Sequence, residues 1–177
     1  MTALDGWRFC PRCAAAIRRE PGRAVCDACG FVAYASSAPT ASAVLVDAAG
    51  RVLLGRRAVE PELGKWDLPG GFLGEGEEPL TGLRRELREE TGLDVEPLSF
   101  LGAWVDSYGD GADAEATLNL YWLVRADGVP RAADDVAELH WFAPDALPPP
   151  GELAFRVNAV VLAAWQRAAA PPAGEAA

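Results

Sequence analysis

The sequence predicts a mixed α/β fold preceded by a small metal-stapled module. Three observations lead to this prediction: an apolar strand-turn-strand pattern after residue 41, one amphipathic helix near the middle of the chain, and two C-x2-C cysteine pairs near its start. The 177 residues suit one domain of about 130 residues plus a module too small to be stable without its ion. We therefore expect a metal-binding module at 1–36, a main domain at 37–168 and a disordered tail, rich in Ala and Pro, at 169–177.

The four cysteines form two pairs, Cys10–Cys13 and Cys26–Cys29, with 12 residues between them. This is close to the spacing of a four-cysteine tetrahedral zinc ribbon. The opening residues have no apolar core of signal-peptide length, which predicts a reducing cytoplasm where disulfides are disfavoured. We therefore expect structural Zn²⁺ on the four thiolates, with disulfides or a redox pair as the alternatives. Gly30 suits the tight turn after the second pair, whereas Ala14 after the first implies some strain.

The charge of the chain argues against a nucleic-acid partner. Residues 1–34 hold five arginines and three acids, which gives +2 before four thiolates around Zn²⁺ add −2, and the whole chain carries −10. Such a balance opposes the phosphate attraction that dominates binding to DNA and RNA. No apolar stretch approaches the roughly 20 residues that span a membrane, so we expect no membrane partner. We therefore expect the ribbon to be a folding cap, a dimer contact or a wall of the substrate site, with nucleic-acid contact as the alternative.

The strands and the last helix follow from hydropathy patterning. A strand, a turn and a second strand are predicted at 42–47, 48–50 and 51–57, after a linker at 36–40 rich in Ser, Pro and Thr. Further strands are predicted at 98–106, 116–125 and 137–142, and a closing helix at 153–167.

The central helix is predicted at 79–91. Pro79 suits the first helical position, and Gly92 suits a left-handed C-terminal cap. At about 100° per residue the helix sorts its side chains into an apolar stripe, an acidic flank and a basic flank. The apolar stripe consists of Leu80, Leu83 and Leu87, the acidic flank of Glu86, Glu89 and Glu90, and the basic flank of Arg84, Arg85 and Arg88.

This sorting separates two interpretations of the charged residues. A solvated helix gains about 0.2–0.5 kcal/mol from each mixed-sign i,i+4 pair, and only Arg85 with Glu89 fits that pattern well. Like charges such as Glu86 and Glu90, crowded beside a buried stripe, are unfavourable unless a cation neutralises them. Oxygen ligands favour a hard ion such as Mg²⁺ or Mn²⁺. The helix is therefore predicted to bind metal.

The segment 71–93 matches the pattern G-x5-E-x7-R-E-apolar-x-E-E-x-G-apolar at every defined position. The chain thus resembles the Nudix hydrolase family, and its cysteines resemble the zinc ribbon that some members carry. The resemblance implies an α/β/α sandwich around a mixed sheet. It also implies that the Gly70 carbonyl and the side chains of Glu86, Glu89 and Glu90 hold Mg²⁺ or Mn²⁺, and that Glu77 and Arg85 brace the preceding loop against the helix.

The reaction implied by the resemblance is hydrolysis of a phosphoanhydride in a nucleoside diphosphate linked to another group. Bound ions would neutralise the diphosphate and activate water. Glu86 or Glu89 is the favoured base, and a loop acid is the alternative, because family members differ in this role. The loop candidates are Asp134, Asp135 and Glu138; His140, beside Trp141 in a predicted strand, is expected to be structural.

The sequence says less about the substrate. Zinc-ribbon Nudix proteins include NADH pyrophosphatases, which carry a Ser-Gln-Pro-Trp-Pro-Phe-Pro stretch where this chain has the unrelated segment 94–109. The chain looks more like the ADP-ribose pyrophosphatase-like group, so ADP-ribose ranks first, before FAD, dinucleoside polyphosphates and oxidised nucleotides. Candidate substrate contacts, each with a structural alternative, are Arg56, Arg57, Trp66, Phe72 and Tyr108.

A rival hypothesis is a non-catalytic Nudix-fold sensor that uses the ribbon as a partner surface. A sensor that has lost catalysis is expected to lack a metal-binding glutamate, but Glu86, Glu89 and Glu90 are all present. The sequence therefore favours an enzyme. The resemblance also leaves room for a homodimer, since Nudix enzymes of this group are often dimers.

Overall fold

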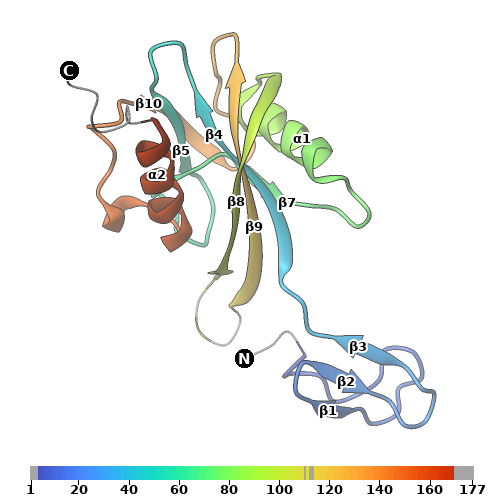
Figure 1. Ribbon diagram of the computed structural model, residues 1–177. Coiled ribbons are helices and arrows are strands. Elements are labelled where there is room, and N and C mark those ends of the chain that lie inside the picture. Colours follow the sequence, from blue (N-terminus) through green and yellow to red (C-terminus); the bar gives the residue numbers. More distant parts are fainter. Residues whose placement is uncertain (1–3, 110, 112–113, 170–177) are drawn as a thin grey trace, which may run out of the picture.

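The computed structural model describes residues 4–109, 111 and 114–169. Figure 1 shows a long twisted sheet with a helix on either side and a small N-terminal sheet that projects away from it. The expected tail lies almost wholly outside the described residues, since these end at 169. The elements are β1 (Arg18–Glu20), β2 (Arg23–Val25), β3 (Val32–Tyr34), β4 (Ala38–Val46), β5 (Val52–Arg57), β6 (Trp66–Asp67), β7 (Gly70–Phe72), α1 (Pro79–Thr91), β8 (Val95–Tyr108), β9 (Glu115–Ala126), β10 (Val136–Phe142), a 3-10 turn (Pro150–Glu152) and α2 (Arg156–Ala169).

The large sheet is mixed. Its strand order is β10-β5-β4-β9-β8, with β6 paired to β5 and β7 paired to β4. The β4 and β9 strands run parallel, and the other pairs are antiparallel. Six consecutive residues in the middle of β4 are buried, as expected for a central strand covered on both faces.

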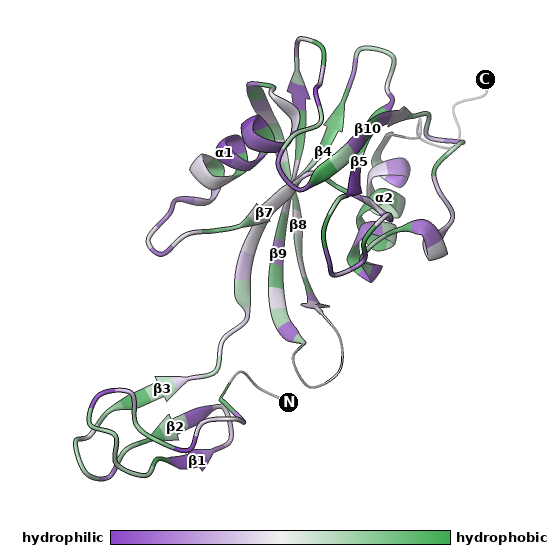
Figure 2. Ribbon diagram, turned by 180° about the vertical axis from the view of Figure 1, so that it is seen from behind, coloured by the Kyte–Doolittle hydropathy of each residue, from purple (hydrophilic) through white to green (hydrophobic). Residues whose placement is uncertain are grey.

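One helix covers each face of the sheet, which Figures 1 and 2 show from opposite sides. Leu83 and Leu87 of α1 are fully buried against a cluster that contains Ala41, Ala43 and Leu45. On the other face, α2 contributes Val157, Val161, Leu162 and Trp165 to a second cluster. The predicted α/β/α sandwich with a mixed sheet is confirmed.

The central helix has the predicted bounds, Pro79–Thr91. The Glu78 carboxylate accepts a hydrogen bond from the Leu80 N–H at 3.0 Å and so caps the first turn. At the other end Gly92 has φ 70° and donates to the Arg88 carbonyl, which is a left-handed cap that glycine adopts without strain. Local sequence alone thus fixes both ends of α1.

Two expectations about element ends are wrong, and tertiary contacts explain both. The expected linker at 36–40 overlaps β4, because Pro39 and Thr40 continue the parallel pairing with β9. The closing helix begins at Arg156 instead of residue 153. Leu153 forms a bridge with Trp66, and the Ala154 N–H donates to the Trp66 carbonyl at 2.8 Å, so this segment is extended.

The N-terminal part is a separate three-stranded sheet, β1-β2-β3. It is joined to β4 by residues 35–37, and in Figure 1 it lies beyond the end of β4, apart from the sandwich. We propose the same division that the sequence suggests, with the ribbon at 1–36 and the main domain at 37–168. Among the described residues, no helix is long and apolar enough to cross a membrane.

Candidate active site

The site begins at the Pro69-Gly70-Gly71 turn, where β7 pairs closely with β4. Gly70 has φ 139°, and a Cβ at this position would lie 2.3 Å from the Ala41 carbonyl oxygen. Only glycine therefore allows this approach. The turn brings the Gly70 N–H to 2.8 Å from a carboxylate oxygen of Glu90 on α1.

The Glu90 side chain is buried between loop and helix. Burial raises the pKa of Glu90 well above its ordinary value, and the negative charges of Asp67, Asp135 and Glu86 raise it further. The hydrogen bond from the Gly70 N–H acts in the opposite direction but is outweighed. A buried carboxylate surrounded by other acids is unfavourable without a positive partner. A cation beside Glu90 would therefore stabilise its charged form.

Glu86 lies one helical turn before Glu90 and rests on Gly71. A Cβ on Gly71 would be 2.6 Å from the carboxyl carbon of Glu86, so the glycine leaves the space that this carboxylate fills. Burial raises the pKa of Glu86 despite its hydrogen bond from Arg85, and the charges of Glu89 and Asp135 act in the same direction.

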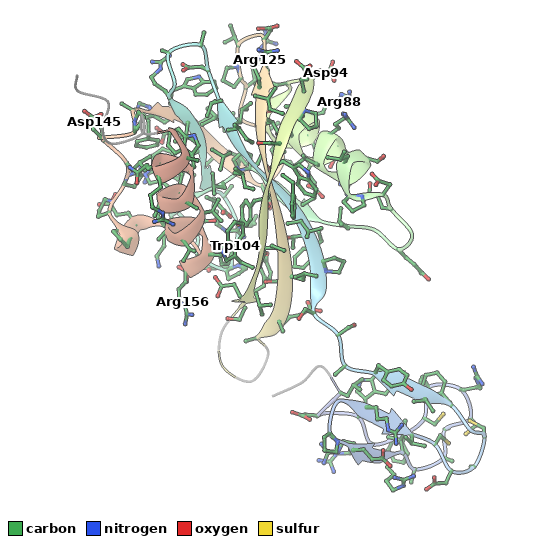
Figure 3. The ribbon with its side chains drawn as sticks, viewed as in Figure 1. Arg88, Asp94, Trp104, Arg125, Asp145 and Arg156 are labelled. Carbon is green, nitrogen blue, oxygen red and sulfur yellow. The ribbon has the colours of Figure 1, made fainter. Side chains whose placement is uncertain are left out.

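Arg85 links the acids instead of facing away from them. Its guanidinium contacts both carboxylate oxygens of Glu77 at 3.0 and 2.9 Å, and Nη1 lies 2.7 Å from Glu86 and 3.1 Å from Glu89. The expected separation of acidic and basic flanks is therefore wrong at Arg85, because its long side chain reaches back over the acidic flank. Arg88 does turn away and pairs with Asp94 at 2.8 Å, as Figure 3 shows.

The bidentate pair of Glu77 and Arg85 fastens the loop to the helix. Arg85, together with the Gly74 N–H, lowers the pKa of Glu77 to about 2. The Arg85 Nη2 also donates to the Phe72 carbonyl at 3.2 Å. These contacts hold the segment after β7 against α1, in the arrangement that the brace hypothesis requires.

The donor set suits a hard cation. Its members are carboxylate oxygens and a glycine loop, and such oxygen sets favour Mg²⁺ or Mn²⁺. In the described residues, three or more ligand side chains converge within 4.8 Å only at the cysteines. The helix acids are spread because Glu90 binds Gly70, Glu86 binds Arg85, and Glu89 is about half exposed.

A pocket opens beside this corner, between the large sheet and α2. It encloses about 580 Å³ of empty space, which includes open solvent at its mouth. Gly70 and Gly71 form one edge of it, so the pocket is continuous with the carboxylate corner. Its other lining residues are Thr40, Ser42, Arg57, Asp67, Leu68, Phe72, Asp106, Ser107, Tyr108, Thr117, Asn119, Tyr121, Asp135, Phe155 and Val157.

Three aromatic rings line one wall of the pocket. Phe72 meets Tyr108 edge to face at 5.2 Å between ring centres, and Tyr108 stacks on Phe155 at 5.6 Å. The Arg57 guanidinium lies 5.2 Å from the Phe155 ring and 5.8 Å from the Tyr108 ring. Flat aromatic surface beside a cation is well suited to an electron-rich planar group such as a nucleobase.

The floor of the pocket is polar but internally satisfied. The Asn119 amide accepts from the Thr40 hydroxyl at 2.9 Å and donates to the Thr117 hydroxyl at 2.9 Å and the Trp104 carbonyl at 3.3 Å. Because each group has a partner, the floor is rigid and needs no ligand to complete it.

A second metal-binding arrangement lies in the ribbon. The sulfurs of Cys10 and Cys29 are 3.7 Å apart and those of Cys13 and Cys26 are 3.6 Å apart, and all four lie within 4.8 Å. Figure 3 shows the ribbon's sulfur atoms gathered at one end. A tetrahedron with Zn–S distances of about 2.3 Å has edges of about 3.8 Å, which matches the two shorter separations, so these residues fit Zn²⁺.

The closeness of the four sulfurs also shifts the pKa values of these thiols. Burial opposes ionisation of Cys10, but N–H groups of Arg12 and Cys13 outweigh it and lower the pKa of Cys10 to about 7. The Ala15 N–H favours ionised Cys13, but the other sulfurs outweigh it and raise the pKa of Cys13 to about 12. Several thiolates can coexist at this distance only around a cation.

A family model for the NUDIX domain matches residues 36–164, well over half of the chain. The chain belongs to the NUDIX domain family. The match starts two residues before β4 and ends within α2, so the Nudix domain is the sandwich described above, and the ribbon precedes it.

Relatives of the Nudix domain include named hydrolases. A Mycobacterium tuberculosis protein named as an 8-oxo-dGTP diphosphatase is 40% identical over 99 residues, covering 50% of this chain and 67% of the relative. The NAD-capped RNA hydrolase NudC of Pseudomonas aeruginosa is 31% identical over 150 residues, covering 80% of this chain. This chain spans only half of that NudC protein. The family match and the named hydrolases support pyrophosphohydrolase activity.

A solved structure shares the whole architecture. A NUDIX hydrolase from Nitrosomonas europaea superposes with a TM-score of 0.73 at 22% identity and covers 96% of this chain and 97% of its own. A MutT NUDIX hydrolase from Burkholderia pseudomallei has a TM-score of 0.63 at 30% identity and covers 72% of this chain. The first likeness extends over nearly the full chain and supports the fold alone.

Three of the five substrate-binding residues predicted from the sequence line the pocket beside Gly70 and Gly71. Arg57, Phe72 and Tyr108 line it. Trp66 is buried in the core under α2, and Arg56 lies over the Trp66 ring at 4.5 Å and pairs with Glu138 at 3.3 Å, outside the pocket. Adjacent residues of a strand point to opposite faces, which separates Arg56 from Arg57.

The structure also distinguishes the loop acids. Backbone hydrogen bonds from Arg131 and Ala133 to the last turn of α1 hold this loop beside the Nudix helix. Asp135 lines the pocket and its charge acts on Glu86 and Glu90, whereas Asp134 is exposed. His140 packs against the rings of Trp66 and Phe142 and does not line the pocket.

Several lining residues could not be found from the sequence. Phe155 directly precedes α2, Val157 lies in its first turn, and Asp67 follows Trp66 in a strand of two residues. The only local signal for Asp67 is a charged residue between the apolar residues Trp66 and Leu68. Nothing in the local pattern connects α2 with β5, because that contact depends on the packing of α2 across the sheet.

Proposed function

We propose that the protein is a Mg²⁺- or Mn²⁺-dependent hydrolase that cleaves the pyrophosphate bond of a nucleoside diphosphate linked to another moiety. The observation that carries this proposal is the continuity between the acidic corner at Glu86 and Glu90 and the aromatic pocket, which share the Gly70-Gly71 turn. A diphosphate at the turn would place its nucleoside in the pocket.

The residues have distinct roles in this proposal. Gly70 through its carbonyl, and Glu86, Glu89 and Glu90 through their side chains, hold the catalytic ions, while Glu77 and Arg85 brace the loop. Bound ions would neutralise the diphosphate and activate a water molecule. Glu86 or Glu89 takes the proton, and Asp135 is the loop acid best placed to replace them. The four cysteines hold structural Zn²⁺.

The substrate class follows from the pocket, and its individual member requires an assay. ADP-ribose remains first on the sequence grounds given above, followed by FAD and dinucleoside polyphosphates. The names of the relatives add weight to oxidised purine nucleotides and to NAD-capped RNA. Arg57, Phe72 and Tyr108 support any purine-containing substrate, because aromatic stacking does not depend on the individual base.

The test is a phosphate-release panel, coupled to a phosphatase that acts on the monophosphate products, with ADP-ribose, FAD, NADH, a dinucleoside tetraphosphate, 8-oxo-dGTP and NAD-capped RNA, each with Mg²⁺ or Mn²⁺. We expect one clear preference, lost in Glu89→Gln and retained in Glu75→Gln, an exposed acid of the same loop. Turnover that persists after metal removal would contradict the metal-dependent mechanism. The rival sensor would bind a nucleotide tightly without turnover, before and after Glu89→Gln.

A further inference from the structure

One buried polar residue of α2 has no role in the functions described above. Asn158 is fully buried, although its helix neighbours Val157, Val161 and Leu162 belong to an apolar cluster. A buried amide is costly unless its hydrogen bonds are satisfied. An apolar side chain would suit this helix face, so the amide indicates a requirement beyond packing.

The partners of Asn158 form a continuous chain that ends in the pocket. Its Nδ2 donates to Asp67 Oδ1 at 2.8 Å, and its Oδ1 accepts from the Tyr121 hydroxyl at 3.2 Å. The other oxygen of Asp67 accepts from Arg57 Nη1 at 3.0 Å. Tyr121, Asn158, Asp67 and Arg57 thus connect β9, α2, β6 and β5 through three hydrogen bonds.

Arg57 is held in place on several sides. Its Nε donates to the Pro61 carbonyl at 2.7 Å, and Nη2 donates to the Tyr108 hydroxyl at 3.3 Å. Its side chain is only 11% exposed. Burial opposes its charge, but the Asp67 carboxylate outweighs burial and raises the pKa of Arg57. The guanidinium is therefore a permanently charged and nearly immobile group in the pocket wall.

Two donors of Arg57 have no partner among the described residues and are available to a ligand. A guanidinium has five N–H groups, and the bonds to Asp67, Pro61 and Tyr108 use three of them. One N–H is left on each terminal nitrogen. Two donors on neighbouring nitrogens match two adjacent acceptor atoms, as in phosphate oxygens or the O6 and N7 edge of guanine.

We propose that Asn158 and Asp67 are positioning residues that fix the Arg57 guanidinium for recognition of two adjacent acceptor atoms on the nucleotide. This inference rests on the proposed function, since it assumes a nucleotide in the pocket. Asp67 sets the orientation of the guanidinium, and Asn158 fixes Asp67 by occupying the oxygen that Arg57 does not use. Neither residue needs to touch the ligand.

The variant Asn158→Asp tests the chain with little change in size. It keeps an acceptor for Tyr121 but replaces the donor toward Asp67 with a carboxylate. The charged groups near position 158 are Asp67, Arg57 and Asp106. The charges of Asp67 and Asp106 also act on Tyr121. When two carboxylates adjoin, one takes up a proton as the pH falls, and the protonated group restores a donor toward Asp67.

The measurement is the Kd of GDP, ADP and inorganic pyrophosphate with Mg²⁺ by calorimetry, in wild type and variant, from pH 5.5 to 8.5. We expect binding to weaken about tenfold at pH 8.5, the size of a lost hydrogen bond to a charged group, and to approach wild type at pH 5.5. Loss for all three ligands would assign Arg57 to phosphate oxygens. Loss for GDP alone would assign it to the guanine edge.

Two further variants separate positioning from general stability. In an Arg57→Ala background, Asn158→Asp should have no additional effect on Kd, because the group that it positions is gone. Gln166→Ala, which removes a bond from α2 to Pro144 outside the pocket, should leave every Kd unchanged. Should Asn158→Asp fail to fold, Asp67→Asn keeps the size, removes the charge beside Arg57 and should weaken the same ligands.

The proposal is overturned if Asn158→Asp weakens binding equally at all pH values, if its effect adds to that of Arg57→Ala, or if wild type binds none of the ligands. Absence of turnover with intact binding would instead contradict the hydrolase and leave the positioning result standing. The two failures are therefore distinguishable.

Discussion

Replacing Gly71 with alanine tests whether the position of the Glu86 carboxylate controls the reaction. The new Cβ would lie 2.6 Å from the carboxyl carbon and 2.6 Å from Oε2 of Glu86. Ordinary carbon contacts are about 3.5–4.0 Å, so the carboxylate must move by about 1 Å. The backbone of Gly71 lies outside the left-handed region, and alanine is not strained there.

The expected result is a large loss of rate with little loss of stability. A displacement of about 1 Å in a reacting group lowers the rate about 100-fold, equivalent to about 2.7 kcal/mol of transition-state stabilisation. The melting temperature should change little, because the group that yields is the far end of a flexible side chain and not backbone. The assay is kcat and the Mg²⁺ concentration for half-maximal rate on the best substrate of the panel.

Gly74→Ala is the matched control in the same loop. Its Cβ would lie 3.6 Å from the nearest oxygen of Glu77, an ordinary contact, and its N–H would still reach Glu77. We expect this variant to keep its rate within about threefold, well inside the 100-fold loss expected for displacement. The reasoning is refuted if Gly71→Ala stays equally active, or if both variants lose activity together.

Three further predictions concern the brace and the ribbon. Because Arg85 lowers the pKa of Glu77 from 4.5 to about 2, the contact stabilises the fold above pH 4.5 and loses this effect as the pH falls toward 2. The difference in unfolding free energy between wild type and Glu77→Gln should therefore shrink over that interval in urea titrations; a constant difference would contradict the assignment. Ala14 has φ 60° and Gly30 has φ 73°, and this left-handed region favours glycine over alanine. Ala14→Gly should therefore strengthen zinc retention by about 0.5–1 kcal/mol, and Gly30→Ala should weaken it, as measured by chelator competition. The opposite order would rule out backbone strain. Zinc removal should increase hydrogen exchange in residues 4–34 alone, whereas Mg²⁺ removal should stop turnover and leave exchange unchanged; spread of the zinc effect into the sandwich would show that the ribbon supports the Nudix fold.

Much of the fold was predictable because its signals are local. The helix at 79–91 is specified by one contiguous segment, which has a proline at its start and a glycine after its end. The cysteine pairs are equally compact in sequence, and the structure brings their sulfurs together. Strand centres were predicted, but β4 extends through Pro39 and Thr40 because its partner β9 continues beside it.

In the candidate site, too, the features set by local sequence were predictable and those set by tertiary contacts were not. The signature places Glu86, Glu89, Glu90 and Gly70 near one another through helix periodicity and one tight turn. Arg85 was misplaced, because helical angle fixes where a side chain starts and not where a long flexible one ends. The separation of Arg57 from Arg56 follows from strand alternation, but only the sheet packing shows which of the two faces the pocket.

By itself, the sequence determined the family signature, the acidic helix, the glycine turn and the four thiols, since each depends on residues a few positions apart. Only the tertiary structure decided the pocket and the chain from Asn158 to Arg57. These join α2 with β5, β6 and β9 across the sheet, and Asn158 lies 91 positions from Asp67. Contacts over such separations arise from the burial of whole apolar faces, so no local pattern specifies them.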